Sequence, residues 1–156
     1  MAGATKNASR FQLTTEILKL SVAQTWNAAR REWSLEEVYK TDEPETCLCG
    51  HYPIIELCIL RNVHNGAQAT VGNICVNKFM GLPSDKIFQA IKRIQKDASK
   101  SFNFEAVQHA FERQWINEWE KDFYGDIVHK RNLTERQETK KLQINERVLR
   151  KVRRQR

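Results

Sequence analysis

The N-terminal part of the chain carries apolar side chains at helical spacing. Between residues 11 and 33 they recur every three or four positions, as one buried face of a helix requires. They are Leu13, Ile17, Leu20, Trp26, Ala29 and Trp33. Ser34 and Glu37 then form a capping-box pattern, which predicts a further helical segment that ends before Pro44.

The segment from about residue 45 to residue 82 has a different pattern. Residues 53–62 and 67–72 are short enough and apolar enough for two strands, and Asn65-Gly66 between them favours a tight hairpin turn with two positive φ angles. Residues 73–80 resemble a short helix with Asn73 as its cap and Gly81 as its stop. The pattern predicts a β-hairpin followed by a short helix.

The remainder of the chain is predicted to be helical. Ser84 caps a helix over residues 84–97, a long aromatic-rich helix runs from about residue 103 to residue 127, and Thr134 with Gln137 caps the last helix. The expected fold class is α+β, mainly helical, with the hairpin inserted between helices. We expect a flexible N-terminus over residues 1–10, a single domain over 11–128 and a basic C-terminal helix or tail over 129–156.

Composition and charge add two constraints. The chain has 156 residues, of which 29% are charged, and it contains no apolar run long enough to cross a bilayer and no apolar leader. We therefore expect a cytoplasmic protein of a bacterial host cell with no membrane partner, where stable disulfides are disfavoured. Of the net charge of +7, residues 129–156 contribute +8, since they hold eleven Lys or Arg and three Glu. This asymmetry favours a polyanionic partner.

The four cysteines are the residues whose pattern indicates a specific chemistry. Cys47 and Cys49 lie in a CLCG turn before the hairpin, and Cys75 lies in the first turn of the short helix that follows it. Clustered cysteines in a reducing compartment are typical zinc ligands, and a turn, a hairpin and a helix in this order form a treble-clef-like site. The usual second ligand on the helix is missing, because Lys78 stands in its place.

The fourth ligand is left open between three residues. His51 is two positions beyond Cys49, Cys58 lies within the first strand of the hairpin, and His64 lies near the hairpin tip. His51 is the favoured choice, because it closes the site from the same turn. We expect the zinc ion to be structural, because the segment is too short to bury a large core and no residue is clearly placed to act as a general base.

The chain resembles small zinc-binding proteins of bacteria and phages. The resemblance is carried by AARREWSLEEVY, CLCGHYPIIELCILRN, NG, VGNICVNKF and DFYGDIVHKRNLTERQ, which together span about residues 28–145. It implies a metal held by Cys47, Cys49, His51 and Cys75 and a phage or mobile-element setting. It implies no particular activity.

Three functions are compatible with these patterns. The first is a non-enzymatic nucleic-acid-binding protein, in which the basic C-terminal helix contacts phosphates. Its contact residues would be Lys140, Lys141, Arg147, Arg150, Lys151, Arg153 and Arg154. The second is a protein-interaction module that regulates or inhibits a host or phage protein. The third and weakest is a metal-dependent nuclease using His64 and Asn77.

Overall fold

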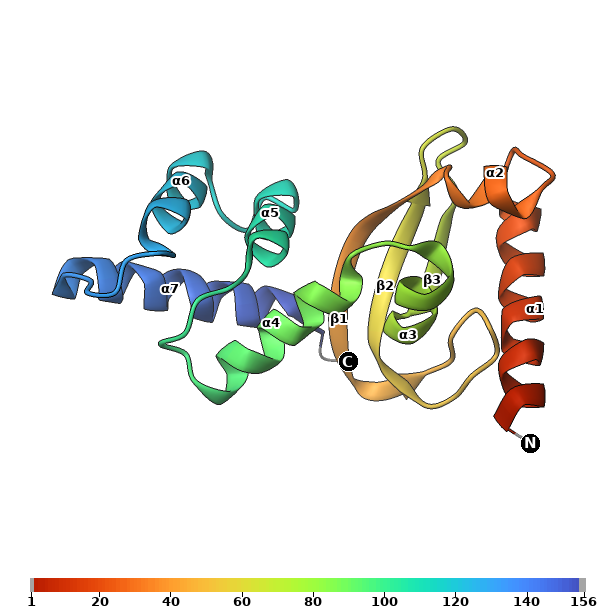
Figure 1. Ribbon diagram of the computed structural model, residues 1–156, viewed down its shortest axis with the longest axis horizontal. Helices are drawn as coiled ribbons and strands as arrows, with labels where there is room; N and C mark the ends of the chain where they lie inside the picture. Colours follow the sequence, from red (N-terminus) through yellow and green to blue (C-terminus); the bar gives the residue numbers. More distant parts are fainter. Residues whose placement is uncertain (1, 155–156) are drawn as a thin grey trace. The chain divides into compact units, whose positions relative to one another are not determined.

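The structure of the protein is a computed structural model that describes the backbone of residues 2–154 and the side chains of residues 8 and 10–153. The chain divides into two compact units (Figure 1). The sheet unit comprises Met1–Ser84 with Arg154–Arg156, and the helical unit comprises Asp85–Arg153. The division falls inside the range 11–128, which the sequence patterns assign to one domain. Among the helices described, none combines the length and apolarity that a bilayer span needs.

The sheet unit combines helices with a small antiparallel sheet, which confirms the α+β fold class. Its elements are α1 (Ala2–Leu20), α2 (Trp26–Arg30), β1 (Trp33–Glu45), β2 (Ile54–Asn62), β3 (Gln68–Gly72), α3 (Asn73–Cys75) and the π-helical segment η1 (Val76–Met80). With the two-residue strand β4 (Arg153–Arg154), the strand order is β3-β2-β1-β4. Both longer strand pairs are antiparallel.

The expected helix over residues 11–33 is interrupted, because a buried carboxylate accepts hydrogen bonds from the backbone between α1 and α2. Glu32 accepts hydrogen bonds from the backbone N–H groups of Val22 (2.9 Å) and Ala23 (2.7 Å), and from the Asn62 side chain (3.1 Å). Two successive N–H groups that bond to one carboxylate are withdrawn from the helix. Sequence periodicity did not reveal this long-range interaction.

The prediction that a helix begins at Ser34 is wrong. Residues 33–45 form β1, in which Ser34 pairs with Arg61 and Val38 pairs with Cys58. The capping-box pattern is present in the sequence, but the burial of Val38 and Tyr39 against the rest of the sheet unit outweighs it.

The hairpin of β2 and β3 is confirmed, and its turn differs from the prediction. Asn62 donates its backbone N–H to the carbonyl of Ala67 (2.8 Å), so four residues form the loop instead of two. Gly66 has a positive φ of 76°, whereas Asn65 does not. The Asn62 side chain accepts the backbone N–H groups of His64 and Asn65, which stabilises this wider loop.

The short helix after the hairpin is also confirmed, including its stop at Gly81, which has a φ of 69°. Its N-cap is Gly72 instead of Asn73. The buried Asn73 side chain instead accepts a hydrogen bond from the hydroxyl of Ser84 at 2.7 Å. Asn73 therefore joins the helix start to the end of the sheet unit.

The helical unit consists of four helices connected by turns (Figure 1). They are α4 (Ser84–Lys96), α5 (Phe104–Glu112), α6 (Glu118–Ile127) and α7 (Glu135–Val152). The helix predicted over residues 84–97 and the Thr134–Gln137 capping box are confirmed. The single helix predicted over residues 103–127 is wrong, because Asn117 and Glu120 form a second capping box that starts α6.

A buried polar network joins the elements of the helical unit. The Asn145 side chain donates to the carbonyls of Ala98 (2.9 Å) and Lys100 (2.8 Å) and accepts the hydroxyl of Tyr124 (2.7 Å). The Tyr124 oxygen in turn accepts the backbone N–H of Phe102 at 2.8 Å. Burial raises the pKa of Tyr124 to about 12. The network fixes the position of α7 against α6 and the turn after α4.

Candidate functional site

Three buried cysteines of the sheet unit meet at one point. The sulfur atoms of Cys47, Cys49 and Cys75 all lie within 4.8 Å of one another. Thiolates that surround a zinc ion tetrahedrally, at about 2.3 Å from it, are roughly 3.8 Å apart. The three sulfurs are therefore close enough to share one ion, and this thiol cluster could hold a metal ion.

The turn before β2 positions the first two sulfurs. Gly50 donates its N–H to the carbonyl of Cys47 (2.8 Å), and Cys47 donates to the carbonyl of His51 (2.9 Å), so the chain closes on itself within five residues. Gly50 has a φ of 90°, a left-handed conformation that suits glycine. A Cβ at this position would also lie 2.8 Å from the side-chain oxygen of Gln12 on α1.

Backbone N–H groups point at the Cys47 sulfur. Gly72 donates to it at 3.2 Å and Cys49 donates at 3.5 Å. Hydrogen bonds of this kind stabilise a thiolate more than a thiol. A Cβ at position 72 would come within 3.2 Å of Ile54 and 3.5 Å of the Cys47 sulfur, so glycine allows β3 to approach the turn.

Hydrogen bonds among the three thiols shift the pKa values of Cys47 and Cys75 in opposite directions. A hydrogen bond from Cys75 and those from the backbone lower the pKa of Cys47 to about 5. The same hydrogen bond to Cys47, together with burial, raises the pKa of Cys75. Burial also raises the pKa of Cys49. A divalent cation would neutralise the negative charge of thiolates that are held this close together.

The other residues considered as fourth ligands lie outside the thiol cluster. Cys58 is fully buried in β2 between Val38 and Val71, and burial raises its pKa to about 12, as expected for a core thiol. His51 is exposed beside the cluster at the end of the CLCG turn, and His64 is exposed in the hairpin loop. Within the described part of the chain, neither histidine belongs to a metal-ligand group.

The predicted nucleic-acid contacts on α7 and in β4 fall into two sets. Arg150 and Lys151 on α7 and Arg153 in β4 are exposed, whereas Lys140, Lys141 and Arg147 are only half-exposed. Lys141 lies 3.4 Å from the hydroxyl of Ser101. The side chain of Arg154 lies outside the described residues.

Glu120 on α6 organises Lys140 and Arg147. This carboxylate is 3% exposed, and both of its oxygens accept from one guanidinium nitrogen (Nη1) of Arg147 at 2.8 Å. The Lys140 ammonium lies 3.1 Å from it. Burial alone would raise the pKa of Glu120, but the hydrogen bonds from Arg147, the Asn117 backbone and Lys140 outweigh burial and lower it.

An exposed aromatic pair lies beside Lys140. Trp119 is 61% exposed and stacks on Phe123, with ring centroids 5.4 Å apart and an interplanar angle of 11°. The Lys140 ammonium lies 5.6 Å from the centre of the Trp119 ring. The sequence patterns placed Trp119 inside the single long helix predicted over residues 103–127. The capping box at Asn117 is the signal that would have placed the start of α6 correctly.

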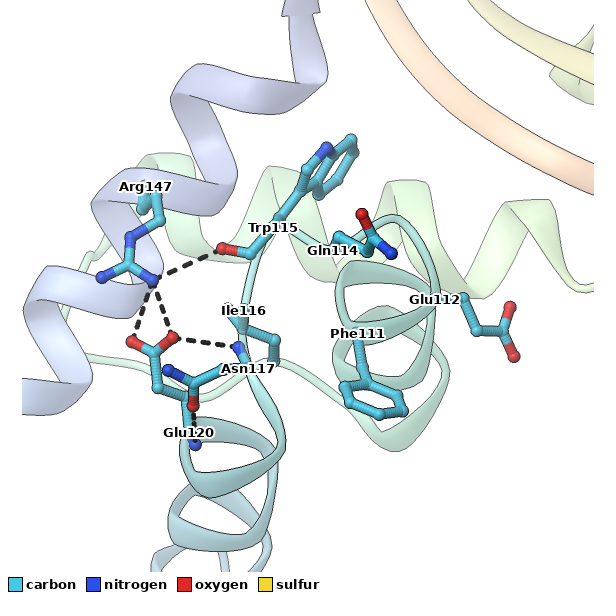
Figure 2. A pocket seen from close by; sticks show the side chains of 8 residues that line it. All are labelled: Phe111, Glu112, Gln114, Trp115, Ile116, Asn117, Glu120 and Arg147. Atoms are coloured by element: carbon cyan, nitrogen blue, oxygen red, sulfur yellow. Dashed lines mark hydrogen bonds and ion pairs between the residues drawn. The ribbon is translucent and has the colours of Figure 1, made fainter.

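An open hollow of about 610 Å³ lies at the connection between α5 and α6 (Figure 2). Side chains from this connection, from both helices and from α7 line it. They are Phe111, Glu112, Gln114, Trp115, Ile116, Asn117, Glu120 and Arg147. The hollow was not predicted, because it forms where the expected long helix is broken.

Comparison of the chain with models of protein families, with curated proteins and with solved structures finds no match. The function must therefore be inferred from the thiol cluster, the surface of α7 and the hollow themselves.

Proposed function

We propose that the protein is a non-enzymatic nucleic-acid-binding protein, in which a structural zinc ion stabilises the sheet unit and α7 of the helical unit contacts phosphates. The observation that carries the binding function is an alignment of cations along one face of α7. The bacterial or phage setting implied by the sequence resemblance is part of the same proposal.

The alignment follows from helix geometry. Each residue turns an α-helix by about 100°, which places five cations of α7 within an arc of roughly 100°. They are Arg136, Lys140, Arg147, Arg150 and Lys151, which we call the basic stripe. By the same rule the buried residues Ile144 and Val148 lie at about 80° and 120° from Arg136, so the buried face of α7 begins at the Lys151 edge of the stripe. A row of cations on the solvent side is the pattern that a polyanionic backbone requires.

The Glu120 interactions leave the basic stripe able to bind phosphate. Arg147 uses only its Nη1 atom for Glu120 and for the carbonyl of Trp115 (3.4 Å), and among the described residues its Nη2 and Nε atoms have no partner. Figure 2 shows one guanidinium nitrogen of Arg147 joined to both Glu120 oxygens and to the Trp115 carbonyl. An arginine held at one edge presents the other edge for two hydrogen bonds to a phosphate.

A salt series tests this function. We expect the purified chain to bind oligonucleotides at low salt, and the double variant Arg150→Gln/Lys151→Gln to bind more weakly with a salt slope smaller by about 1.4 to 1.8. The matched control is Arg31→Gln/Lys78→Gln, which removes two exposed cations from the sheet unit. Equal weakening by both double variants would show that net charge, and not the basic stripe, is responsible. Absence of binding at low salt would contradict the function.

The zinc proposal rests on the donor set. Three sulfurs within 4.8 Å of one another and N–H groups aimed at Cys47 favour a soft or borderline divalent cation, and zinc is the common one for such sites. The turn, the β2–β3 hairpin and the helix that holds Cys75 form a treble-clef-like arrangement around it. We keep His51 as the fourth ligand, because it ends the same turn.

The fourth ligand is tested by metal content and by spectroscopy of the cobalt-substituted protein. With His51 as a ligand, His51→Ala should bind metal more weakly and should change the visible spectrum of bound Co²⁺, because a nitrogen ligand is replaced. An unchanged spectrum would exclude His51, and Cys58→Ser would then be examined in the same way.

A protein-interaction module is the second candidate function. It is favoured by apolar side chains that remain exposed, among them Phe104 (73%) at the start of α5 and Ile74 (72%) next to Cys75. Replacement of Phe104 by Ser should then abolish binding of a protein partner captured from host lysate and leave oligonucleotide affinity unchanged. If the Phe104→Ser variant still captured the partner, the exposure of Phe104 would no longer support a protein-interaction function.

A further inference from the structure

The hollow at the α5–α6 connection shares a residue with the basic stripe. Arg147 belongs to the stripe and also lines the hollow, next to Glu120 and Ile116 (Figure 2). A phosphate bound at Arg147 would therefore bring its nucleotide next to the hollow. This inference rests on the proposed function and concerns what the hollow does for it.

The side chains around the hollow suit a nucleobase. Phe111, Trp115 and Ile116 provide apolar contact surface, and Phe111 and Trp115 are aromatic rings that can stack on a flat base. Trp115 is held in place by an edge-on contact with His109, at 5.5 Å between ring centroids. A Lys121 ammonium lies 4.5 Å from the centre of the Phe111 ring, so a base can occupy only its other face.

Two amide side chains, Gln114 and Asn117, line the hollow together with the charged side chains of Glu112, Glu120 and Arg147. Asn117 uses its oxygen to cap α6 at the N–H of Glu120 (2.8 Å), which leaves its NH₂ group to donate elsewhere. Gln114 is exposed, with both its oxygen and its NH₂ group available. Amides of this kind pair with the mixed donor and acceptor edges of bases.

The backbone of Gln114 is an independent indication of function. Trp115 donates to the carbonyl of Ala110 (2.9 Å) and Gln114 donates to that of Phe111 (3.0 Å), which is the hydrogen-bond pattern of a Schellman motif at the end of α5. This motif requires a left-handed residue, and Gln114 has a φ of 62°. Glycine is the residue that this position favours. A non-glycine residue with a left-handed backbone that lines a hollow points to a role in binding.

We infer that the hollow holds an unpaired base of a single-stranded nucleic acid whose phosphates contact the basic stripe. Stacking on Phe111 or Trp115 needs an exposed base face, and a double helix buries the faces of its bases between neighbours. The exposed Trp119, beside Lys140, provides a second stacking surface along the same strand. The protein should therefore prefer single strands to duplexes.

The test compares three labelled probes on the unmodified, metal-loaded chain by fluorescence anisotropy at low salt. They are a short oligothymidylate, an abasic strand of the same length and a duplex of the same length. We expect the oligothymidylate to bind about five- to tenfold more tightly than the abasic strand, as stacking of one base predicts. The abasic strand should still bind through the basic stripe.

Two variants locate the base. Gln114→Gly relieves the left-handed strain and so keeps the fold, and Phe111→Leu keeps apolar volume but removes the ring. Each should reduce the affinity for oligothymidylate several-fold without changing the affinity for the abasic strand. The control is Gln89→Ala, which removes an exposed amide from α4, far in sequence from the hollow.

The outcomes separate the inference from the function on which it rests. Equal affinity for the oligothymidylate and the abasic strand would overturn the base site and leave phosphate binding by the stripe intact. The same holds if Gln114→Gly and Phe111→Leu both bind oligothymidylate like the unmodified chain. Absence of binding to all three probes would overturn both the base site and the proposed function.

Discussion

The two units of the chain achieve stability by different means. The sheet unit gathers three cysteines in a small structure, and its ten Lys or Arg nearly balance its eight Asp or Glu. The helical unit has no cysteine and carries sixteen Lys or Arg against eleven Asp or Glu. Its interior combines apolar residues with the Asn145–Tyr124 network. Under the proposed function, metal-dependent folding belongs to the sheet unit and polyanion binding to the helical unit.

The comparison is tested most strongly by removal of the metal. Cys47→Ser, or chelation of the unmodified protein, should unfold the sheet unit, because a structural zinc ion contributes about 10 kcal/mol or more to folding. Hydrogen exchange followed by mass spectrometry should show loss of protection in β2 and β3 and retained protection in α6 and α7. Cys58→Ser is the control, since we expect it to cost only about 1 to 3 kcal/mol and to keep the metal.

Loss of protection in both units after chelation would contradict the separation. The two units would then form one cooperative structure that depends on the ion.

The reverse perturbation is made in the helical unit. Asn145→Ala removes two bonds to backbone carbonyls and the acceptor of the Tyr124 hydroxyl, and should destabilise this unit by about 3 kcal/mol. Zinc content should not change. Urea unfolding monitored by hydrogen exchange of α7 measures the effect, with the exposed Gln143→Ala on the same helix as control. A drop in zinc content would show that the units are coupled.

Acid should weaken the helical unit through Glu120. The folded-state pKa of this carboxylate is lowered, so the stability it provides is complete above its ordinary pKa and is lost as the pH falls through the folded-state value. Near neutral pH, Glu120→Gln should cost roughly 2 kcal/mol, because the charge-assisted bonds to Arg147 and Lys140 are weakened. The difference between the two proteins should shrink below about pH 4. Denaturant unfolding at neutral and acidic pH checks this, and a constant difference would contradict the role of the charge.

The smallest effect is a gain in stability. Gln114→Gly should stabilise the helical unit by about 1 kcal/mol, because glycine adopts the left-handed conformation of the Schellman motif without strain. The midpoint of urea unfolding measures it. Destabilisation would mean that the Gln114 side chain contributes to the fold, and the argument for a binding role would lose its support.

The sequence predicted those elements whose signals are local. The β2–β3 hairpin, the helix stop at Gly81 and the Thr134–Gln137 capping box were all correct, since each depends on a few neighbouring residues. The grouping of Cys47, Cys49 and Cys75 was also predictable, because hairpin geometry brings the two segments together. Each of these predictions uses a short-range rule.

The errors arise where distant residues override a local pattern. Ser34 and Glu37 have the spacing of a capping box, yet pairing with β2 makes this segment a strand. Glu32 withdraws two N–H groups from the expected first helix, and no periodicity reveals that contact. The break at Gln114 was missed because the aromatic residues on both sides continue the apolar pattern.

The exposure of Trp119 follows from the same missed break. Once α6 begins at Glu118, Trp119 falls in its first turn and is displayed next to Lys140 on α7. The pairing of Glu120 with Arg147 and Lys140 joins two helices and is not encoded in any local motif. The proposed binding surface therefore could not be derived from the sequence beyond its positive charge.

Native mass spectrometry of protein purified without chelators tests the central claim most directly, since it weighs each folded chain together with its bound ions. The proposed thiol site requires one zinc ion per chain in the unmodified protein and none in Cys47→Ser or Cys75→Ser. A fully folded, metal-free unmodified chain would contradict it.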